Sequence, residues 1–163
     1  MKNEVTWIEK YEQFNVFVIS LKDIPADLWL CPIKEGKWSI GEIVSHFYYW
    51  EKFILEERLQ KFLSGEKDFV KPDVELMNQA ASEFAKSGAS RETIINLFTE
   101  SRSQIAALLT SLPAEVLDCE ISFGSNPITI RKYIIGFEEH DQHHKRQIEE
   151  FLQEKASGPK QLP

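Results

Sequence analysis

The sequence predicts an all-α protein in which four long amphipathic helices form a four-helix bundle. Four long stretches repeat apolar residues at three- and four-residue steps, which is the period of an amphipathic helix. Segments that hold proline, glycine and polar turn residues separate these stretches. Helices of this kind bury their apolar faces against one another, so a bundle is the expected architecture.

The first two helices are predicted from their apolar faces and from one capping motif. Residues 3–21 form the first helix, with an apolar stripe of Trp7, Ile8, Tyr11, Phe14, Phe17, Val18 and Leu21. The second helix begins near Ile40, because Ser39 and Glu42 have the spacing of a capping box, and it reaches about residue 62. Its apolar face contains Ile40, Ile43, Val44, Phe47, Trp50, Ile54, Leu55, Leu59 and Phe62. Glu51 falls near the middle of that face, where a carboxylate needs a partner or a metal ion.

The second half of the chain continues the pattern after a long connection. A short extra helix is expected over residues 72–84, and a third main helix over residues 91–111 ends before Pro113. Residues 119–127 alternate weakly between apolar and polar side chains, so we expect a short hairpin or an extended crossover. The fourth helix spans residues 128–155. The long connection leaves both a simple up-and-down order and an up-down-down-up order open.

Length and composition indicate one domain in a reducing compartment. A chain of 163 residues can bury one substantial core, which we assign to residues 1–156, with residues 157–163 as a flexible tail. The formal net charge of −7 opposes nucleic-acid binding, which needs a basic surface. No apolar run approaches a membrane span, and the N-terminus lacks the apolar core of a signal peptide. Cys31 and Cys119 have no C-x-x-C spacing, so we expect a cytoplasmic protein with inert thiols.

Three of the four histidines lie in the last helical stretch, YIIGFEEHDQHHKRQIEEFL, residues 133–152. His140 and His144 are one turn apart on the apolar side of this helix, and that spacing suits two ligands of one metal ion. His143 points roughly a quarter turn further away and is the alternative to His144. The fourth histidine, His46, lies on the flank of the apolar face of the second helix, one turn before Trp50.

Two stretches of the sequence contain histidines in motifs of defined spacing, WSIGEIVSH over residues 38–46 and HDQHHKRQI over residues 140–148. The first is similar to the pattern W-S-x-x-E-[IL]-x-x-H and the second to the closing pattern H-x-x-H-H-x-x-Q-I. Both patterns are those of the DinB/YfiT-like family of metal-dependent bundles, which this sequence resembles. The resemblance covers nearly the whole chain, and it implies an up-down-down-up bundle, a homodimer, and metal ligands at His46, His140 and His144. It also implies activity as a metal-dependent hydrolase or as a transferase of thiols such as bacillithiol, mycothiol or glutathione.

The residue chemistry is consistent with those expectations. Three neutral imidazoles suit zinc, nickel, iron, cobalt or manganese and leave a coordination position for water or substrate. Glu51 and Asp141 are candidates to accept the second N–H of a ligating histidine. The other interpretation is that they form a buried ion pair, with an arginine such as Arg58. We therefore expect an enzyme that activates a thiol or water against a small molecule, and the alternative is a non-catalytic metal-binding structural or interaction bundle.

Several further residues receive less specific interpretations. Trp38 and Trp50 are expected to serve packing, and the run Glu56, Glu57 and Arg58 is expected to be a solvated face. Glu138, Glu139 and Gln147 lie near the histidines and are also expected to be mostly solvated. The aromatic residues of the first helix, Trp7, Tyr11, Phe14 and Phe17, are more than one bundle core needs, which favours a homodimer.

Overall fold

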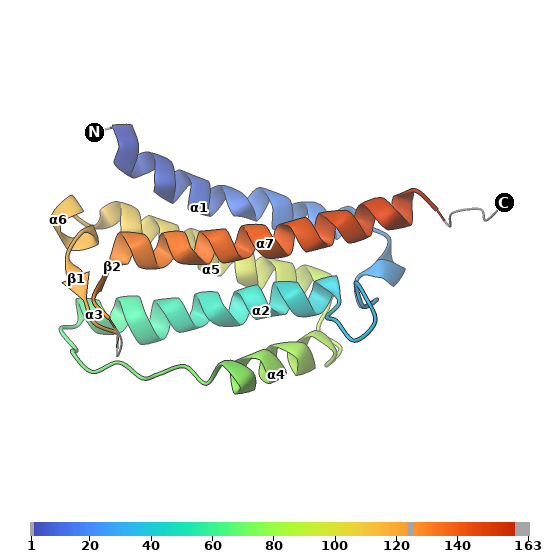
Figure 1. Cartoon of the computed structure of the whole chain (residues 1–163), viewed down its shortest axis with the longest axis horizontal. Coiled ribbons are helices and arrows are strands. Elements are labelled where there is room, and N and C mark those ends of the chain that lie inside the picture. Colours follow the sequence, from blue (N-terminus) through green and yellow to red (C-terminus); the bar gives the residue numbers. More distant parts are fainter. Residues whose placement is uncertain (1, 124–125, 159–163) are drawn as a thin grey trace.

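The computed structural model describes residues 2–123 and 126–158, and it confirms the predicted four-helix bundle. The four long helices are α1 (Lys2–Ser20), α2 (Ile40–Phe53), α5 (Arg91–Ser111) and α7 (Ile130–Ala156). Followed by colour in Figure 1, α1 and α7 run in one direction along the bundle and α2 and α5 run in the other. The order is therefore up-down-down-up, and the packed pair α2 and α5 is parallel.

The helix that begins with α2 continues beyond Phe53 through a change of helical type. A π-helical segment, η3 (Ile54–Gln60), follows directly and leads into α3 (Lys61–Leu63). Together the three segments cover the predicted second helix. The capping box forms as predicted, because the Ser39 hydroxyl accepts a hydrogen bond from the Glu42 amide while the Glu42 carboxylate accepts one from the Ser39 amide.

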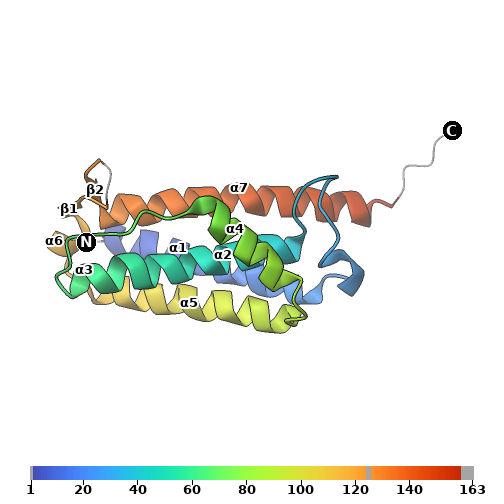
Figure 2. The same cartoon turned by 90° about the horizontal axis from the view of Figure 1, so that it is seen from below.

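A short helix, α4 (Val74–Ala85), lies in the connection between α2 and α5, as predicted. The carboxylate of Asp73 accepts a hydrogen bond from the amide of Leu76 at 3.1 Å and so caps it. Two side-chain bonds attach α4 to α2: Ser45 Oγ donates to the carbonyl of Ala81 at 2.7 Å, and Ser82 Oγ donates to Glu42 Oε2 at 2.5 Å. Figure 2 shows α4 lying across the bundle beside α2.

The remaining elements are short and close the two ends of the bundle. Two 3₁₀ turns, η1 (Leu21–Asp23) and η2 (Ala26–Leu28), follow α1, and α6 (Ala114–Leu117) follows α5. The hairpin forms from β1 (Glu120–Ile121) and β2 (Ile128–Thr129), which pair antiparallel with Glu120 opposite Thr129. The last helix therefore begins at Ile130 and not at residue 128 as predicted, because residues 128–129 pair in this hairpin. The predicted hairpin segment includes residues 124–125, and the predicted tail includes residues 159–163; both ranges lie outside the described residues.

The apolar interior consists of two clusters along the bundle axis. One is centred on Phe14, Phe47 and Phe98, whose rings approach one another at 5.4–6.1 Å between centroids. The other includes the fully buried side chains Ile54, Leu59, Ile105, Leu109, Ile130 and Ile134. Each long helix also buries at least one polar group in this interior, and four of these belong to Tyr11, Glu51, Arg102 and Asp141.

Those four polar residues form a single network that joins all four long helices. Arg102 of α5 is 0% exposed, and its Nη2 donates to Glu51 Oε1 at 2.5 Å and to Asp141 Oδ2 at 2.6 Å. Its Nη1 donates to the carbonyl of Tyr11 at 3.0 Å, and the Tyr11 hydroxyl donates to Glu51 Oε2 at 2.5 Å. Buried charges need such partners, so the network fixes the relative positions of the helices.

Candidate metal centre

Three histidines from two helices converge at one point of the bundle. His46 comes from α2, and His140 and His144 are consecutive turns of α7. One nitrogen of each ring lies within 4.8 Å of one nitrogen of each of the others. Burial decreases in the order His46, His144, His140, so the cluster reaches from the interior to the surface.

Two amide side chains set the orientation of two of these rings. His46 Nδ1 lies 2.9 Å from Asn78 Oδ1 of α4, and His144 Nδ1 lies 3.0 Å from Gln147 Oε1. An amide oxygen can only accept a hydrogen bond, so each Nδ1 must carry the proton and each Nε2 must carry a lone pair. The Nε2 atoms of His46 and His144 are therefore the nitrogens that can bind a metal ion.

The donor set fits a divalent ion. His140 Nε2 and His144 Nε2 are 3.3 Å apart, and two nitrogens on one tetrahedral zinc ion lie about 3.4 Å apart. His46 Nε2 is buried and, among the described residues, has no hydrogen-bonding partner. A buried polar atom without a partner is unfavourable in a folded protein, and a metal ion at this position would provide one.

The surroundings also keep the imidazoles neutral, which is the form that binds metals. The pKa of His46 is lowered to about 3, first by burial and then by His144, against an opposing contribution from the Asn78 contact. Burial lowers the pKa of His144 to about 4, with His140 acting in the same direction. The pKa of His140 is also lowered, first by burial and then by His143.

The remaining histidine and the two candidate carboxylates lie elsewhere. His143 is exposed and is not part of the cluster, although its ring centroid is 5.6 Å from that of His144. Glu51 and Asp141 bind Arg102, so the ion pair that the sequence left open is formed with Arg102 and not with Arg58. Burial raises the pKa of Asp141 to about 7; Arg102 lowers it and Glu51 raises it, since one guanidinium serves two buried carboxylates.

The expectation of a solvated face at Arg58 is wrong. Arg58 is 2% exposed, its Nη2 donates to the carbonyl of Val70 at 2.8 Å, and its guanidinium lies 4.6 Å from the ring centroid of Phe53. Glu138 is also buried, with Lys10 at 3.6 Å, and Gln147 is half-buried against His144. Arg58 faces inward because the connection from α3 to α4, which contains Val70, covers it.

Sequence reasoning missed Asn78 and Arg102. Asn78 carries no signal of its own, because it lies in a different helix from every histidine and meets His46 only in the folded chain. Arg102 did carry one: it lies four residues after Phe98 and three before Ile105, which places it on the apolar face of α5. A charged residue on that face predicts a buried ion pair, but the choice of partner depends on which helices pack together.

The family model of the DinB superfamily matches residues 11–148, which is most of the chain and includes all four histidines. The chain belongs to the DinB superfamily. No curated protein matches it in sequence. Among solved structures, it is similar to YfiT from Bacillus subtilis, described as "a probable metal-dependent hydrolase with an unusual four-helix bundle topology".

The likeness of this DinB protein to YfiT is one of fold. The TM-score is 0.78 at 18% sequence identity, and the match covers 96% of this chain and 89% of the YfiT chain. At 96% coverage, the matched region includes all four long helices, so the likeness extends to their order along the chain. At this identity the comparison supports the shared fold, and the chemistry of this DinB protein has to be argued from its own side chains.

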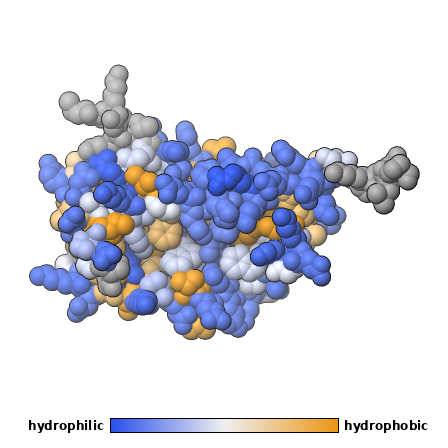
Figure 3. All heavy atoms as spheres, viewed as in Figure 1, coloured by the Kyte–Doolittle hydropathy of each residue, from blue (hydrophilic) through white to orange (hydrophobic). Residues whose placement is uncertain are grey.

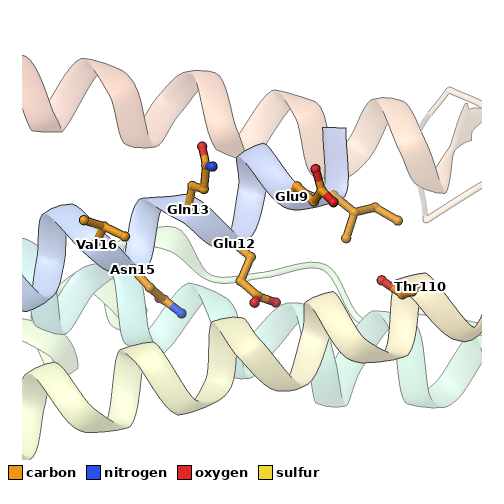
Figure 4. A pocket seen from close by; sticks show the side chains of 7 residues that line it. Glu9, Glu12, Gln13, Asn15, Val16 and Thr110 are labelled. Carbon is orange, nitrogen blue, oxygen red and sulfur yellow. The ribbon is translucent and has the colours of Figure 1, made fainter. Parts of the chain in front are cut away.

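Two open cavities at the surface of the bundle have different linings. A cavity of about 460 Å³ is lined by His46 and His140 and by the apolar side chains Trp50, Tyr133 and Phe137. Another, of about 490 Å³, lies between α1 and α5, where Glu9, Glu12, Asn15 and Thr110 line it (Figure 4). The second cavity contains no histidine, so only the first connects with the histidine cluster of this DinB protein.

Proposed function

We propose that this DinB protein is a metal-dependent enzyme that activates a thiol or a water molecule against a small electrophile. His46, His140 and His144 are the proposed ligands of one divalent ion such as zinc, nickel, manganese, iron or cobalt. The observation that carries the proposal is the buried Nε2 of His46, which has no partner among the described residues and belongs to the cluster of three convergent rings.

The second argument concerns coordination number. Three protein ligands leave at least one position of the ion for substrate, whereas structural zinc sites are closed by four. When bound, such an ion lowers the pKa of a water or thiol toward neutrality and so supplies a nucleophile at physiological pH. The cavity lined by His46 and His140 gives a small molecule access to that position.

The chain's own residues would act by holding the reacting groups in place. Asn78 and Gln147 accept hydrogen bonds from the Nδ1–H groups of His46 and His144 and keep the Nε2 lone pairs directed at the site.

The two candidate reactions differ in the bonds that change. In thiol transfer, a C–S bond forms, the bond from carbon to the leaving group breaks, and the thiol proton passes to solvent. In hydrolysis, water adds across an ester or amide bond, giving an acid and an alcohol or amine.

Metal analysis of purified variants tests the ligand set. Alanine at His46, His140 or His144 should abolish stoichiometric binding of one ion per chain, measured by elemental analysis after dialysis. His143→Ala is the matched control, because His143 lies on the same helix and outside the cluster. Full metal retention in His144→Ala, together with loss in His143→Ala, would show that the wrong face of α7 was chosen.

Activity is tested separately with metal-loaded protein. Monochlorobimane and chlorodinitrobenzene would be offered with bacillithiol, glutathione and cysteine in turn, beside a panel of esters and amides. We expect turnover that chelation and His140→Ala abolish. Protein that binds one ion per chain but is inert with every metal across this panel would instead be a non-catalytic metal-binding bundle.

We further infer a cytoplasmic homodimer. Both cysteines are free thiols, which fits a reducing compartment. Among the described helices, none is both long and apolar enough to cross a membrane. The inference of a dimer rests on the resemblance to the family and on apolar side chains exposed along α1, Val16 and Ile19.

A further inference from the structure

The cavity beside the histidine cluster has a lining that is largely aromatic and aliphatic. Its walls include Trp50 of α2, Tyr133 and Phe137 of α7, and Ile128 of β2. Trp50 and Phe137 pack together with their ring planes tilted by 44° and their centroids 5.5 Å apart, and Tyr133 packs edge to face on Phe137 at 5.1 Å. Trp50, which the sequence suggested for packing, therefore also lines the cavity. Rings arranged in this way favour a flat apolar molecule.

The cavity also has one fixed positive charge. Lys132 is the one lysine or arginine among the described residues that line it, and none of those residues is a carboxylate. Among the described residues no carboxylate pairs with the Lys132 ammonium group. Lys132 lies in the first turn of α7, where the helix dipole disfavours a cation. An anionic group in the cavity would pair with the Lys132 ammonium group and offset its unfavourable interaction with the helix dipole.

Gly136 lies between Lys132 and His140, and its missing side chain keeps the cavity open. The three residues are spaced by four, so they stack on one face of α7. A Cβ atom added at Gly136 would meet no heavy atom within 4 Å, so no packing contact requires glycine here. Glycine inside a helix lowers the stability of the helix. At Gly136 it leaves open space beside His140 that a side chain would fill.

These observations indicate a ligand whose two ends differ, one anionic and the other placed at the histidine cluster. The Cα atoms of Lys132 and His140 are about 12 Å apart along the helix axis, from eight residues at 1.5 Å each. A small molecule of that length could place an anionic group at Lys132, its apolar body over Gly136, and its opposite end at His140. The aromatic rings would then contact the apolar body along the open pocket.

We propose that this cavity binds the electrophilic substrate and that it selects a flat, apolar small molecule carrying one carboxylate or sulfonate group. Lys132 recognises the anion, Gly136 leaves room for the apolar body, and the electrophilic end lies at the histidine cluster. The inference rests on the proposed function, since it takes the reaction to occur at that cluster. It adds the substrate class and two residues that determine specificity.

Binding of two fluorescent probes tests the inference without requiring turnover. The probes are 8-anilinonaphthalene-1-sulfonate and N-phenyl-1-naphthylamine, which share one aromatic skeleton and differ in the sulfonate. Fluorescence titrations would use the full chain, both metal-free and zinc-loaded. We expect both probes to bind, with the sulfonate favoured about fivefold, as one partly exposed ion pair allows.

Matched variants separate the two roles. Lys132→Gln should remove the preference for the sulfonate, whereas Lys155→Gln, with the same change in net charge near the other end of α7, should keep it. Gly136→Leu should weaken both probes at least tenfold, and Gly136→Ala should do so less, with zinc content retained and thermal stability not reduced in either variant. Equal binding of the two probes by wild type, or Lys132→Gln behaving like Lys155→Gln, would overturn the charge recognition.

Probe binding that Gly136→Leu leaves unchanged would place the probes elsewhere and overturn the cavity assignment. The results also separate this inference from the proposed function. Stoichiometric zinc without probe binding refutes the substrate class alone. If probe binding depends on Lys132 and Gly136 but the protein fails to bind zinc when zinc is offered, the binding site is supported and the metal centre is refuted.

Discussion

At the scale of single residues, the histidine cluster depends on two amides as much as on the imidazoles. Asn78 and Gln147 each accept an Nδ1 proton, so His46 and His144 are held in the tautomer that leaves Nε2 for a metal ion. A carboxylate in either place would raise the pKa of the ring, whereas an amide does so less. The amides therefore orient the rings and allow burial to keep them neutral.

The lowered pKa values predict how zinc binding depends on pH. Protons compete for the metal-binding nitrogens, and a pKa below the ordinary value keeps the neutral ring available at lower pH. Lowering the pH from 7 to 6 should weaken zinc binding to the wild-type chain by less than about threefold, against roughly thirtyfold for three ordinary histidines. Competition titrations with a zinc chelator at both pH values measure this. A loss near thirtyfold would mean that the rings titrate as exposed histidines.

Arg102 provides a prediction about stability. Arg102→Met leaves the carboxylates of Glu51 and Asp141 buried without a cation, and breaking a buried pair in this way costs about 3–5 kcal/mol. Urea unfolding of the metal-free variant measures the loss. Arg131→Met is the control, because its partner Asp118 is 50% exposed, so that pair should contribute less, about 1 kcal/mol. Equal losses in the two variants would contradict the central role of Arg102.

At the scale of elements, the start of α2 depends on a close approach of the preceding turn. The Gly41 amide donates to the carbonyl of Trp29 at 2.8 Å, and a Cβ at Gly41 would lie 2.9 Å from the Trp29 indole nitrogen. Trp29 is buried, so its ring cannot easily move away. The glycine lets this turn pack against the capped end of the helix that carries His46.

Two glycine substitutions should therefore have opposite effects. Gly41→Ala should destabilise the protein by about 1–3 kcal/mol, because the added methyl group overpacks the contact with Trp29. Gly136→Ala should stabilise it by about 0.5–1 kcal/mol, because alanine is the better helix former and the space is open. Thermal and urea unfolding of both variants provide the test. Stabilisation by Gly41→Ala would contradict the close approach.

The boundaries of the long helices could be predicted because their signals are local. Ser39 with Glu42 caps α2, Asp73 caps α4, and Thr129 caps α7 through the Lys132 amide at 3.1 Å. The π-helical segment η3 could not be predicted, because its sequence carries the ordinary apolar period of an α-helix. Its buried Arg58 binds the Val70 carbonyl in the following loop, a contact between segments that no local pattern encodes.

At the scale of the whole molecule, the order of the helices and the partners of buried charges depend on contacts between distant segments. Periodicity placed His140 and His144 on one face of α7 and His143 off it, and the structure brings the first two together with His46. Glu51 was predicted to be buried, but its partner was not identified, since choosing Arg102 over Arg58 requires knowing which helices pack together. The order up-down-down-up likewise came from the family resemblance, not from the apolar pattern.

The surface bears on how the molecule assembles. The face in Figure 3 is mostly hydrophilic, and its hydrophobic residues form several separate patches. The aromatic residues of the first helix do not support a dimer by themselves, because Tyr11 and Phe14 are buried in the bundle of their own chain. Among the described side chains of α1, the exposed large apolar ones are Val16, at 71%, and Ile19, at 47%. These two residues are where a contact between copies is expected.

The homodimer is therefore predicted to form through α1. Multi-angle light scattering at micromolar concentration should give about twice the chain mass of 18.9 kDa. The double variant Val16→Glu with Ile19→Glu should give the mass of a single chain, because burying two carboxylates at an apolar contact is strongly unfavourable. Leu76→Glu is the matched control, since Leu76 is 62% exposed on α4, away from α1. A single-chain mass for the wild type would refute the dimer, and a dimer that persists in the double variant would place the contact on another face.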